Sequence, residues 1–226
     1  MLSTVLSTVG AAYKLSDEWT ALGKNLYSAV YNRAAADKLD DWLQLGLAYR
    51  ESDANRVNAL LRAEYRHERV ASHDGVGAAA ASAGFGATAD SRRDVAVVSA
   101  HLNVQPSAGL LLSGRVAAKW ANETSLGIAS RSTTQLIGGR ATYDLTREWD
   151  LGLQAGLLIS DGARARQWGL GAELGRVVAE NLWIGIGWNV FGFADKDLSA
   201  QDYTNPGVYL RLRWKFDEAL LRRATE

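Results

Sequence analysis

The sequence predicts an all-β fold, an antiparallel up-and-down transmembrane β-barrel, and three features of the 226-residue chain indicate it. Long segments alternate apolar and polar residues, short and long connections follow one another in turn, and no run of about 18 uncharged apolar residues could form a transmembrane helix. The composition agrees, since the chain has 22 Gly, 8 Trp and 8 Tyr but 2 Pro. Because all-β barrels of this length are commonly single domains, we expect one barrel domain over residues 1–216 and a C-terminal extension over residues 217–226.

The alternation is most regular in the last predicted strand, where successive side chains of an extended chain point to opposite faces. One face of this segment is apolar and consists of Val208, Leu210, Leu212, Trp214 and Phe216. The other face is mostly cationic and consists of Tyr209, Arg211, Arg213 and Lys215. A membrane barrel satisfies both faces, because the apolar one contacts lipid and the cationic one borders a watery lumen.

Turns divide the chain into eleven predicted strands. The short turns cover residues 16–18, 51–55, 105–108, 146–148 and 179–181, and the longer connections cover residues 33–39, 70–93, 122–131, 160–166 and 194–205. This alternation is typical of outer-membrane barrels, which have short periplasmic turns and long external loops. The predicted strands are residues 3–15, 18–32, 39–51, 55–69, 93–105, 108–122, 131–145, 148–160, 165–178, 181–194 and 205–216. Most exceed the roughly 9–11 residues that a tilted membrane strand needs.

The number of strands predicts that the barrel has a further one. With short turns in the periplasm, the last predicted strand ends there and the first begins outside the cell. A single-chain barrel normally has both ends in the periplasm and an even strand number, so we expect twelve strands, with one preceding residue 1. Closure with eleven strands, or a strand from another chain, is the alternative. The residues after Met1 lack the basic region of a secretory signal, so we expect a removed signal or a piece of a longer exported chain.

Charged residues gather on the predicted inward face. The predicted pore-lining residues are Arg62, Glu64, Arg66, Arg115, Lys119, Arg140, Asp144, Glu173, Arg211, Arg213 and Lys215. Cations outnumber anions in this set, so an open lumen would favour anions weakly. The alternative is a closed lumen that these charges fill by pairing with one another. The low-complexity residues 75–89 predict an external loop, with a constriction loop inside the lumen as the alternative.

Aromatic residues cluster near the ends of the predicted strands. Those near the short turns are Tyr13, Trp19, Tyr49, Tyr143, Trp149 and Trp214, and those near the long connections are Trp42, Trp120 and Trp168. These positions predict two girdles at the two membrane–water interfaces, where amphipathic rings are favoured. The alternative is cross-strand aromatic packing in a soluble sandwich.

Catalytic, metal and nucleic-acid functions have little support in the sequence. Lys plus Arg and Asp plus Glu are balanced at 25 each, which gives no whole-chain attraction for nucleic acid. Cys is absent, the 3 His residues lack metal-ligand spacing, and the Gly-x-Ser-x-Gly motif of hydrolases does not occur, so we predict no enzyme, no metal and no cofactor. Ser99 and His101 share one face of a predicted strand, and an outer-membrane lipid hydrolase built on this pair is a further alternative.

Two predicted hairpins share one pattern, Tyr-Lys-Leu-Ser-Asp-Glu-Trp at residues 13–19 and Tyr-Asp-Leu-Thr-Arg-Glu-Trp at residues 143–149. Together with the strands at residues 169–175, 181–189 and 207–216, they resemble the C-terminal barrel region of large Gram-negative outer-membrane proteins, in which a long repeat-rich exported portion precedes the barrel. The resemblance covers most of the chain and implies an anchoring or translocating barrel. It also implies that Phe216 is the terminal aromatic residue of an assembly signal, beyond which residues 217–226 extend.

These observations predict an integral barrel of the bacterial outer membrane that serves as the anchor or pore module of a larger exported protein. A stand-alone porin-like channel with weak anion preference is the alternative. The expected partners are outer-membrane lipid, the barrel-assembly machinery, and an N-terminal passenger or missing strand.

Overall fold

A computed structural model of the chain describes residues 2–32, 36–72, 91–125, 127–162, 164–179, 181–192, 198 and 206–214. Regular secondary structure in these ranges consists of antiparallel strands without a helix, which confirms the predicted all-β fold. In the same ranges, no helix has the length and apolar character needed to span a membrane. The predictions for residues 75–89, Lys215, Phe216 and residues 217–226 fall outside the described part of the chain.

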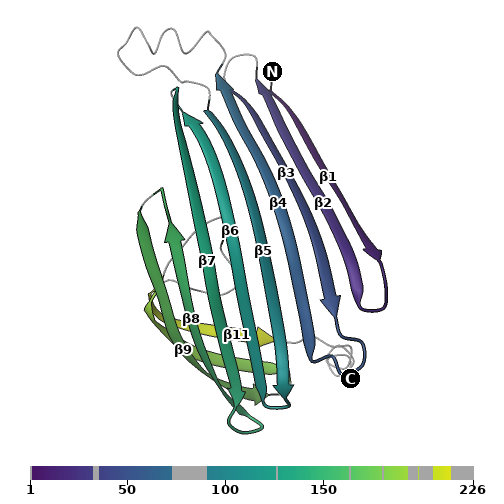
Figure 1. Cartoon of the computed structure of the whole chain (residues 1–226), viewed down its shortest axis with the longest axis vertical. Coiled ribbons are helices and arrows are strands. Elements are labelled where there is room, and N and C mark those ends of the chain that lie inside the picture. Colours follow the sequence, from purple (N-terminus) through teal and green to yellow (C-terminus); the bar gives the residue numbers. More distant parts are fainter. Residues whose placement is uncertain are drawn as a thin grey trace, which may run out of the picture. The chain divides into compact units, whose positions relative to one another are not determined.

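The described residues form eleven strands that follow one another up and down (Figure 1). They are β1 (Leu2–Lys14), β2 (Trp19–Asn32), β3 (Ala36–Arg50), β4 (Val57–Ser72), β5 (Ser91–Ser107), β6 (Leu110–Ser125), β7 (Ile128–Asp144), β8 (Trp149–Ser160), β9 (Ala165–Ala179), β10 (Leu182–Phe191) and β11 (Gly207–Trp214). Their ends differ from the predicted ends by at most three residues, as at the start of β3, which is Ala36 rather than residue 39.

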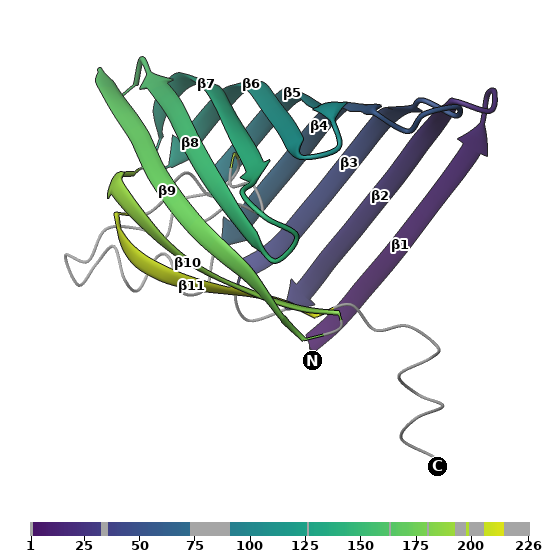
Figure 2. The ribbon, with the colours of Figure 1, turned by 90° about the horizontal axis from the view of Figure 1, so that it is seen from below.

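Each strand pairs with its neighbours in sequence, in the order β1 to β11. Figure 2 shows β1 to β4 side by side in this order. Strands β1 and β11 stand at the two ends of the order and are not paired with each other in the described part of the chain, so the sheet is not closed. The register of β1 with β2 is continuous, from Leu2 opposite Asn32 to Lys14 opposite Thr20. An unbroken register keeps alternate residues on one face along the whole strand.

The β1–β2 and β7–β8 turns have the same hydrogen bonds. The Ser16 hydroxyl accepts from the backbone N–H of Trp19 at 3.1 Å, and the Thr146 hydroxyl accepts from that of Trp149 at 3.1 Å. In both turns, the backbone oxygen of the tryptophan accepts from the residue before the Ser or Thr. A hydroxyl at this position satisfies turn N–H groups, which explains why the two sequences match there.

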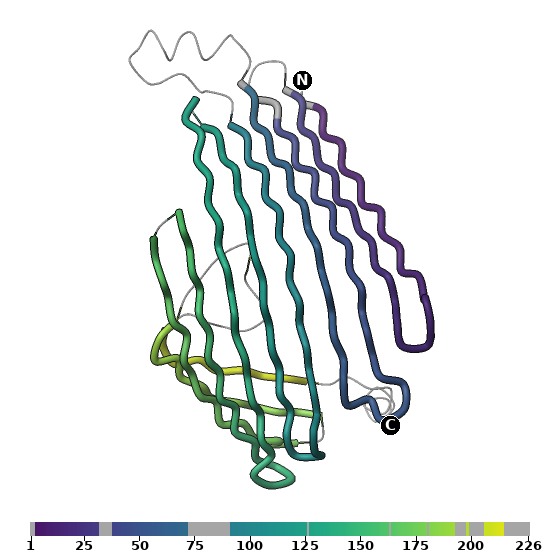
Figure 3. Tube along the Cα trace, in the orientation of Figure 1, coloured from purple at the N-terminus to yellow at the C-terminus, as the bar shows by residue number. Residues whose placement is uncertain are grey.

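The chain forms two compact units. Unit 1 comprises Met1–Leu102, Arg115–Leu136 and Ile159–Arg166, and unit 2 comprises Asn103–Gly114, Ile137–Leu158 and Gln167–Glu226. Strands β1 to β4 belong to unit 1, and β10 and β11 belong to unit 2. Figure 3 follows the Cα trace of the strands in chain order.

Along the strands, buried polar side chains alternate with exposed apolar ones, which is the reverse of the pattern in a soluble protein. On β10 of unit 2, Asn189 is 2% exposed, whereas the adjacent Trp188 is 59% exposed. On β6 of unit 1, Lys119 is 7% exposed, whereas the adjacent Trp120 is 46% exposed. Soluble proteins bury large apolar side chains and expose Lys. Strands with apolar residues outside and polar residues inside are typical of membrane barrels.

Candidate pore-facing and membrane-facing surfaces

Strand register divides each unit into two faces, because residues opposite each other in adjacent strands share a face. In unit 1, Trp42 is opposite Arg66, and in unit 2, Glu173 is opposite Gly187. We call the face that carries these residues the polar face of each unit, and the other the apolar face. The predicted pore-lining residues that the structure describes all lie on the polar face, as their register, contacts and alternating burial show.

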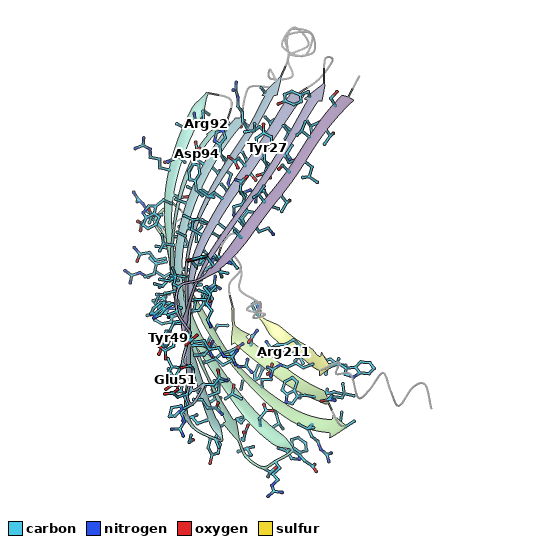
Figure 4. All side chains as sticks on the ribbon, turned by 90° about the vertical axis from the view of Figure 1, so that its right-hand side faces the viewer. Tyr27, Tyr49, Glu51, Arg92, Asp94 and Arg211 are labelled. Carbon is cyan, nitrogen blue, oxygen red and sulfur yellow. The ribbon has the colours of Figure 1, made fainter. Side chains whose placement is uncertain are left out.

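Glu173 is the centre of the polar face in unit 2. Its side chain is 1% exposed, with Arg140 Nη2 at 2.5 Å from Oε1 and Arg211 Nη1 at 3.4 Å from Oε2. Arg140 Nη1 also donates to Gln154 Oε1 at 3.1 Å, and Gln154 Nε2 donates to Asn189 Oδ1 at 2.6 Å. Figure 4 labels Arg211 on its strand. Five strands, β7 to β11, thus contribute to one linked polar group in which two guanidinium groups flank a buried carboxylate.

Trp183 covers two glycines on the same face of unit 2. A side chain at Gly175 or Gly185 would overlap the Trp183 ring. The ring is held in place, because Trp183 Nε1 donates to the Asp150 carboxylate and Arg213 Cζ lies 4.3 Å from the ring centroid. Trp183 was not among the predicted site residues. The available signal was the repeated glycine at alternate positions, since a strand glycine leaves room for a close neighbour on its own face.

Glu64 organises the polar face near the middle of β3 and β4. Its Oε2 accepts from Trp42 Nε1 at 3.0 Å and from Gln44 Nε2 at 3.1 Å, and Arg62 Nε lies 2.7 Å from its Oε1. The Arg66 guanidinium lies 5.7 Å from the centroid of the Trp42 ring. Trp42, predicted as a girdle residue, is therefore directed to the polar side of the sheet rather than to the apolar face.

Closer to the long connections, Arg66 and Arg93 join three carboxylates. Arg66 Nη2 lies 2.8 Å from Asp40 Oδ2 and 2.6 Å from Glu68 Oε1. Arg93 Nη1 lies 3.3 Å from Glu68 Oε2, and Arg93 Nε lies 2.6 Å from Glu123 Oε1. These three acidic residues were not among the predicted pore-lining set. Arg93 was not in that set either, so these carboxylates pair with one predicted and one unpredicted cation of the polar face.

The remaining predicted pore-lining residues differ in exposure. Lys119 is buried and Arg115 is half-buried, whereas Asp144 is exposed at the end of β7. Charge on the polar face is thus mostly held in paired or buried groups.

The predicted girdle near the short turns lies on the apolar face. The Trp19 and Tyr49 rings have centroids 4.9 Å apart, and Arg176 Cζ lies 5.1 Å from the centroid of the Trp149 ring. Near the short-turn ends of their own strands, the side chains of Tyr13 in unit 1 and of Tyr143 and Trp214 in unit 2 are also exposed. Such rings suit the membrane–water interface.

Of the aromatic residues predicted near the long connections, Trp120 on β6 and Trp168 on β9 are exposed. Tyr27, Tyr31 and Tyr65 lie on the apolar face as well, by their register with β3 and their alternation along β2 and β4. The sequence prediction did not include these three tyrosines, although Tyr31 is next to the end of β2. Counting alternate positions from Trp19 along β2 would have placed the first two on this face.

The proposed Ser–His pair lacks a nucleophile–base contact. Ser99 is buried, and its Oγ has no hydrogen-bond partner, so it does not bond to His101 in the described structure. Activation of a serine requires such a bond. Within the described ranges, no group of three or more His, Cys, Asp or Glu side chains could hold a metal ion.

Comparison with known proteins adds structural neighbours but no family. No family model and no curated protein matches the chain. A mutant of the ferric enterobactin receptor from Pseudomonas aeruginosa is similar with a TM-score of 0.67 at 10% identity over 83% of this chain and 33% of the receptor. The chain thus spans about a third of that receptor's length. The likeness shows a shared fold, that of outer-membrane β-barrel strands.

Two further structures cover most of the chain at lower similarity. The NanC porin has a TM-score of 0.42 at 12% identity, with 94% of this chain and 100% of the porin covered. The translocator domain of the autotransporter NalP from Neisseria meningitidis has a TM-score of 0.37 at 14% identity, with 95% of this chain and 80% of that domain covered.

Proposed function

We propose that the chain is an integral β-barrel of the bacterial outer membrane and the anchor or pore module of a larger exported protein. One observation carries the proposal: large apolar side chains are exposed on one face of the strands, while charged and amide side chains are buried on the other. In water, this arrangement would expose an extensive hydrophobic surface. In a bilayer, the same surface contacts acyl chains and the polar face is screened from them.

A twelfth strand would close the barrel. In lipid, backbone groups along the free edges of β1 and β11 would be unsatisfied, which costs several kcal/mol per group. The two strands run in the same direction, because alternate strands of the antiparallel order are parallel to each other. One added strand that is antiparallel to both restores the up-and-down pattern, whereas direct pairing of β1 with β11 does not. We propose that a segment preceding residue 1 or another chain supplies it.

The polar face of unit 2 favours an anchor over an open channel. Glu173 pairs with both Arg140 and Arg211, and all three side chains are little exposed. Side chains that are paired in this way fill space and leave few groups for a passing solute. A stand-alone porin-like channel with weak anion preference is the second candidate, supported by the excess of cations among the predicted pore-lining residues.

Fractionation of cells that export the full chain tests the membrane assignment. We expect the chain in the outer-membrane fraction, with a faster-migrating form in electrophoresis of unheated samples. Recovery as a soluble periplasmic protein would overturn the assignment.

Conductance in planar bilayers then separates the two candidates. An anchor with a filled lumen gives no steady current. A channel gives discrete steps, and its reversal potential in a salt gradient shows weak selectivity for anions.

A further inference from the structure

A row of polar side chains crosses the apolar face of unit 1 at one level. Tyr27 on β2 is opposite Asp41 on β3, and Asp41 is opposite His67 on β4. His67 Nδ1 lies 2.7 Å from Asp94 Oδ1 on β5. We call these four residues the outer polar row. They interrupt a surface that is otherwise mostly aliphatic. Contact of that surface with lipid acyl chains does not explain why polar side chains lie there.

The outer polar row lies where the aliphatic surface ends. On β3, Leu43 and Leu45 separate it from the girdle at Tyr49, on the same face. From Tyr49 to Asp41 is about 26 Å along the strand, or about 20 Å along the membrane normal at a tilt of about 40°. The apolar band of such barrels is about 25 Å tall. The row is therefore close to the outer edge of the band, on the side of the long connections, where lipid headgroups begin.

One end of the row presents groups that bind phosphate. Arg92 Nε donates to Asp94 Oδ2 at 2.7 Å, and the Tyr65 hydroxyl donates to Asp94 Oδ1 at 2.7 Å (Figure 4 shows Arg92 beside Asp94). The Arg92 side chain is 61% exposed, so part of its guanidinium faces the surroundings. Arg69, also exposed, is two residues from His67 on the same face. Guanidinium groups held in a fixed orientation bind phosphate oxygens strongly.

The other end presents a carboxylate among tyrosines. Asn25 Nδ2 donates to Asp41 Oδ1 at 2.7 Å, and this neutral amide leaves the carboxylate charge in place. Tyr27 is directly opposite Asp41, and Tyr31 lies on the same face with 49% exposure. A carboxylate beside aromatic rings is suited to an ammonium group.

We propose that the outer polar row binds a lipid headgroup that carries both a phosphate and an ammonium group, as in phosphatidylethanolamine. The phosphate binds at Arg69 and Arg92, beside His67 and Asp94, and the ammonium group binds at Asp41. Adjacent strands are about 4.8 Å apart, a spacing that suits two charges joined by a two-carbon linker. The positive charges of Arg69 and Arg92 balance the negative charges of Asp41 and Asp94. A site without net charge fits a zwitterionic headgroup better than an anionic one. The inference rests on the proposed membrane location.

Native mass spectrometry tests the headgroup site. The full chain is folded in detergent micelles with equal amounts of phosphatidylethanolamine and phosphatidylglycerol, which share the phosphate but not the amine. We expect about fivefold more phosphatidylethanolamine than phosphatidylglycerol to remain bound, a ratio typical of one added charged contact. Asp41→Asn should abolish this preference, and Arg92→Gln should lower the retention of both lipids.

Asp40→Asn is the matched control, because Asp40 is adjacent in sequence but binds Arg66 on the polar face. It should leave the lipid preference unchanged. Equal retention of the two lipids by the unmodified chain, or equal loss of preference in the Asp40 and Asp41 variants, would overturn the proposal. Unheated electrophoresis and fractionation of the same samples separate two failures. A folded barrel without lipid preference refutes the headgroup site alone, whereas a chain that folds in water without micelles refutes the proposed membrane role.

Discussion

Replacing Glu173 by Gln should destabilise the folded chain by about 3 kcal/mol, because Arg140 and Arg211 lose the carboxylate that balances them. Breaking a buried ion pair by removing one partner costs about 3–5 kcal/mol. The Arg140 and Arg211 side chains are 12% and 19% exposed, so partial hydration places the expected cost at the lower end of that range. Gln keeps the size of Glu and can accept one hydrogen bond from Arg140, so packing should change little.

Urea titration of the chain in phospholipid vesicles, followed by tryptophan fluorescence, measures this cost as a change in the free energy of unfolding. Glu148→Gln is the matched control, because Glu148 and Arg176 form a pair at 3.2 Å whose side chains are 59% and 50% exposed. An exposed pair contributes about 0–1 kcal/mol. If the Glu173 variant costs no more than this control, the ion pair on the polar face of unit 2 is not desolvated and the reasoning fails.

A double-mutant cycle isolates the pair itself. Adding Arg140→Gln to Glu173→Gln removes one of the unbalanced cations, so the double variant should cost less than the sum of the two single variants. The expected coupling is about 1–3 kcal/mol. Additive costs would show that the two side chains do not interact.

Two further predictions concern packing and pH. Gly175→Ala should destabilise the chain by about 1–3 kcal/mol because the added methyl group overlaps the Trp183 ring, whereas Gly114→Ala, where an added Cβ meets nothing within 4 Å, should be nearly neutral in the same urea titration. In the β1–β2 turn, the hydrogen bond from Lys14 at 2.6 Å and its charge lower the pKa of the Asp17 carboxyl in the folded chain. A carboxyl whose pKa is lower in the folded chain stabilises the fold at pH values above its unfolded-state pKa, near 3.9. This stabilisation is lost as the pH falls through the folded-state pKa. The difference in stability between the unmodified chain and Asp17→Asn should therefore shrink as pH falls below about 4, and a difference that is constant with pH would contradict it.

Alternation along single strands predicted the faces correctly. Arg211 and Trp214 were assigned to opposite faces from the sequence, and the register with β10 places them so. Nearness to a connection was a poorer guide than alternation. It indicated that Trp42 is a girdle residue, whereas the position of Trp42 opposite Arg66 puts it on the polar face. The distance of a residue from a turn gives its height along the strand. Its face depends only on whether it is an odd or an even number of residues from a residue of known face.

The sequence by itself determined the all-β class, the number and approximate ends of the visible strands and the separation of apolar from polar faces. These properties depend on alternation and turn residues, which are local in the chain. The partners of each polar side chain were decided by the tertiary structure. Glu173 meets Arg140 and Arg211 from strands far apart in sequence, and His67 meets Asp94 across the connection between β4 and β5. Such contacts depend on which residues the register brings opposite each other, and a side-chain pattern within one strand does not contain that information.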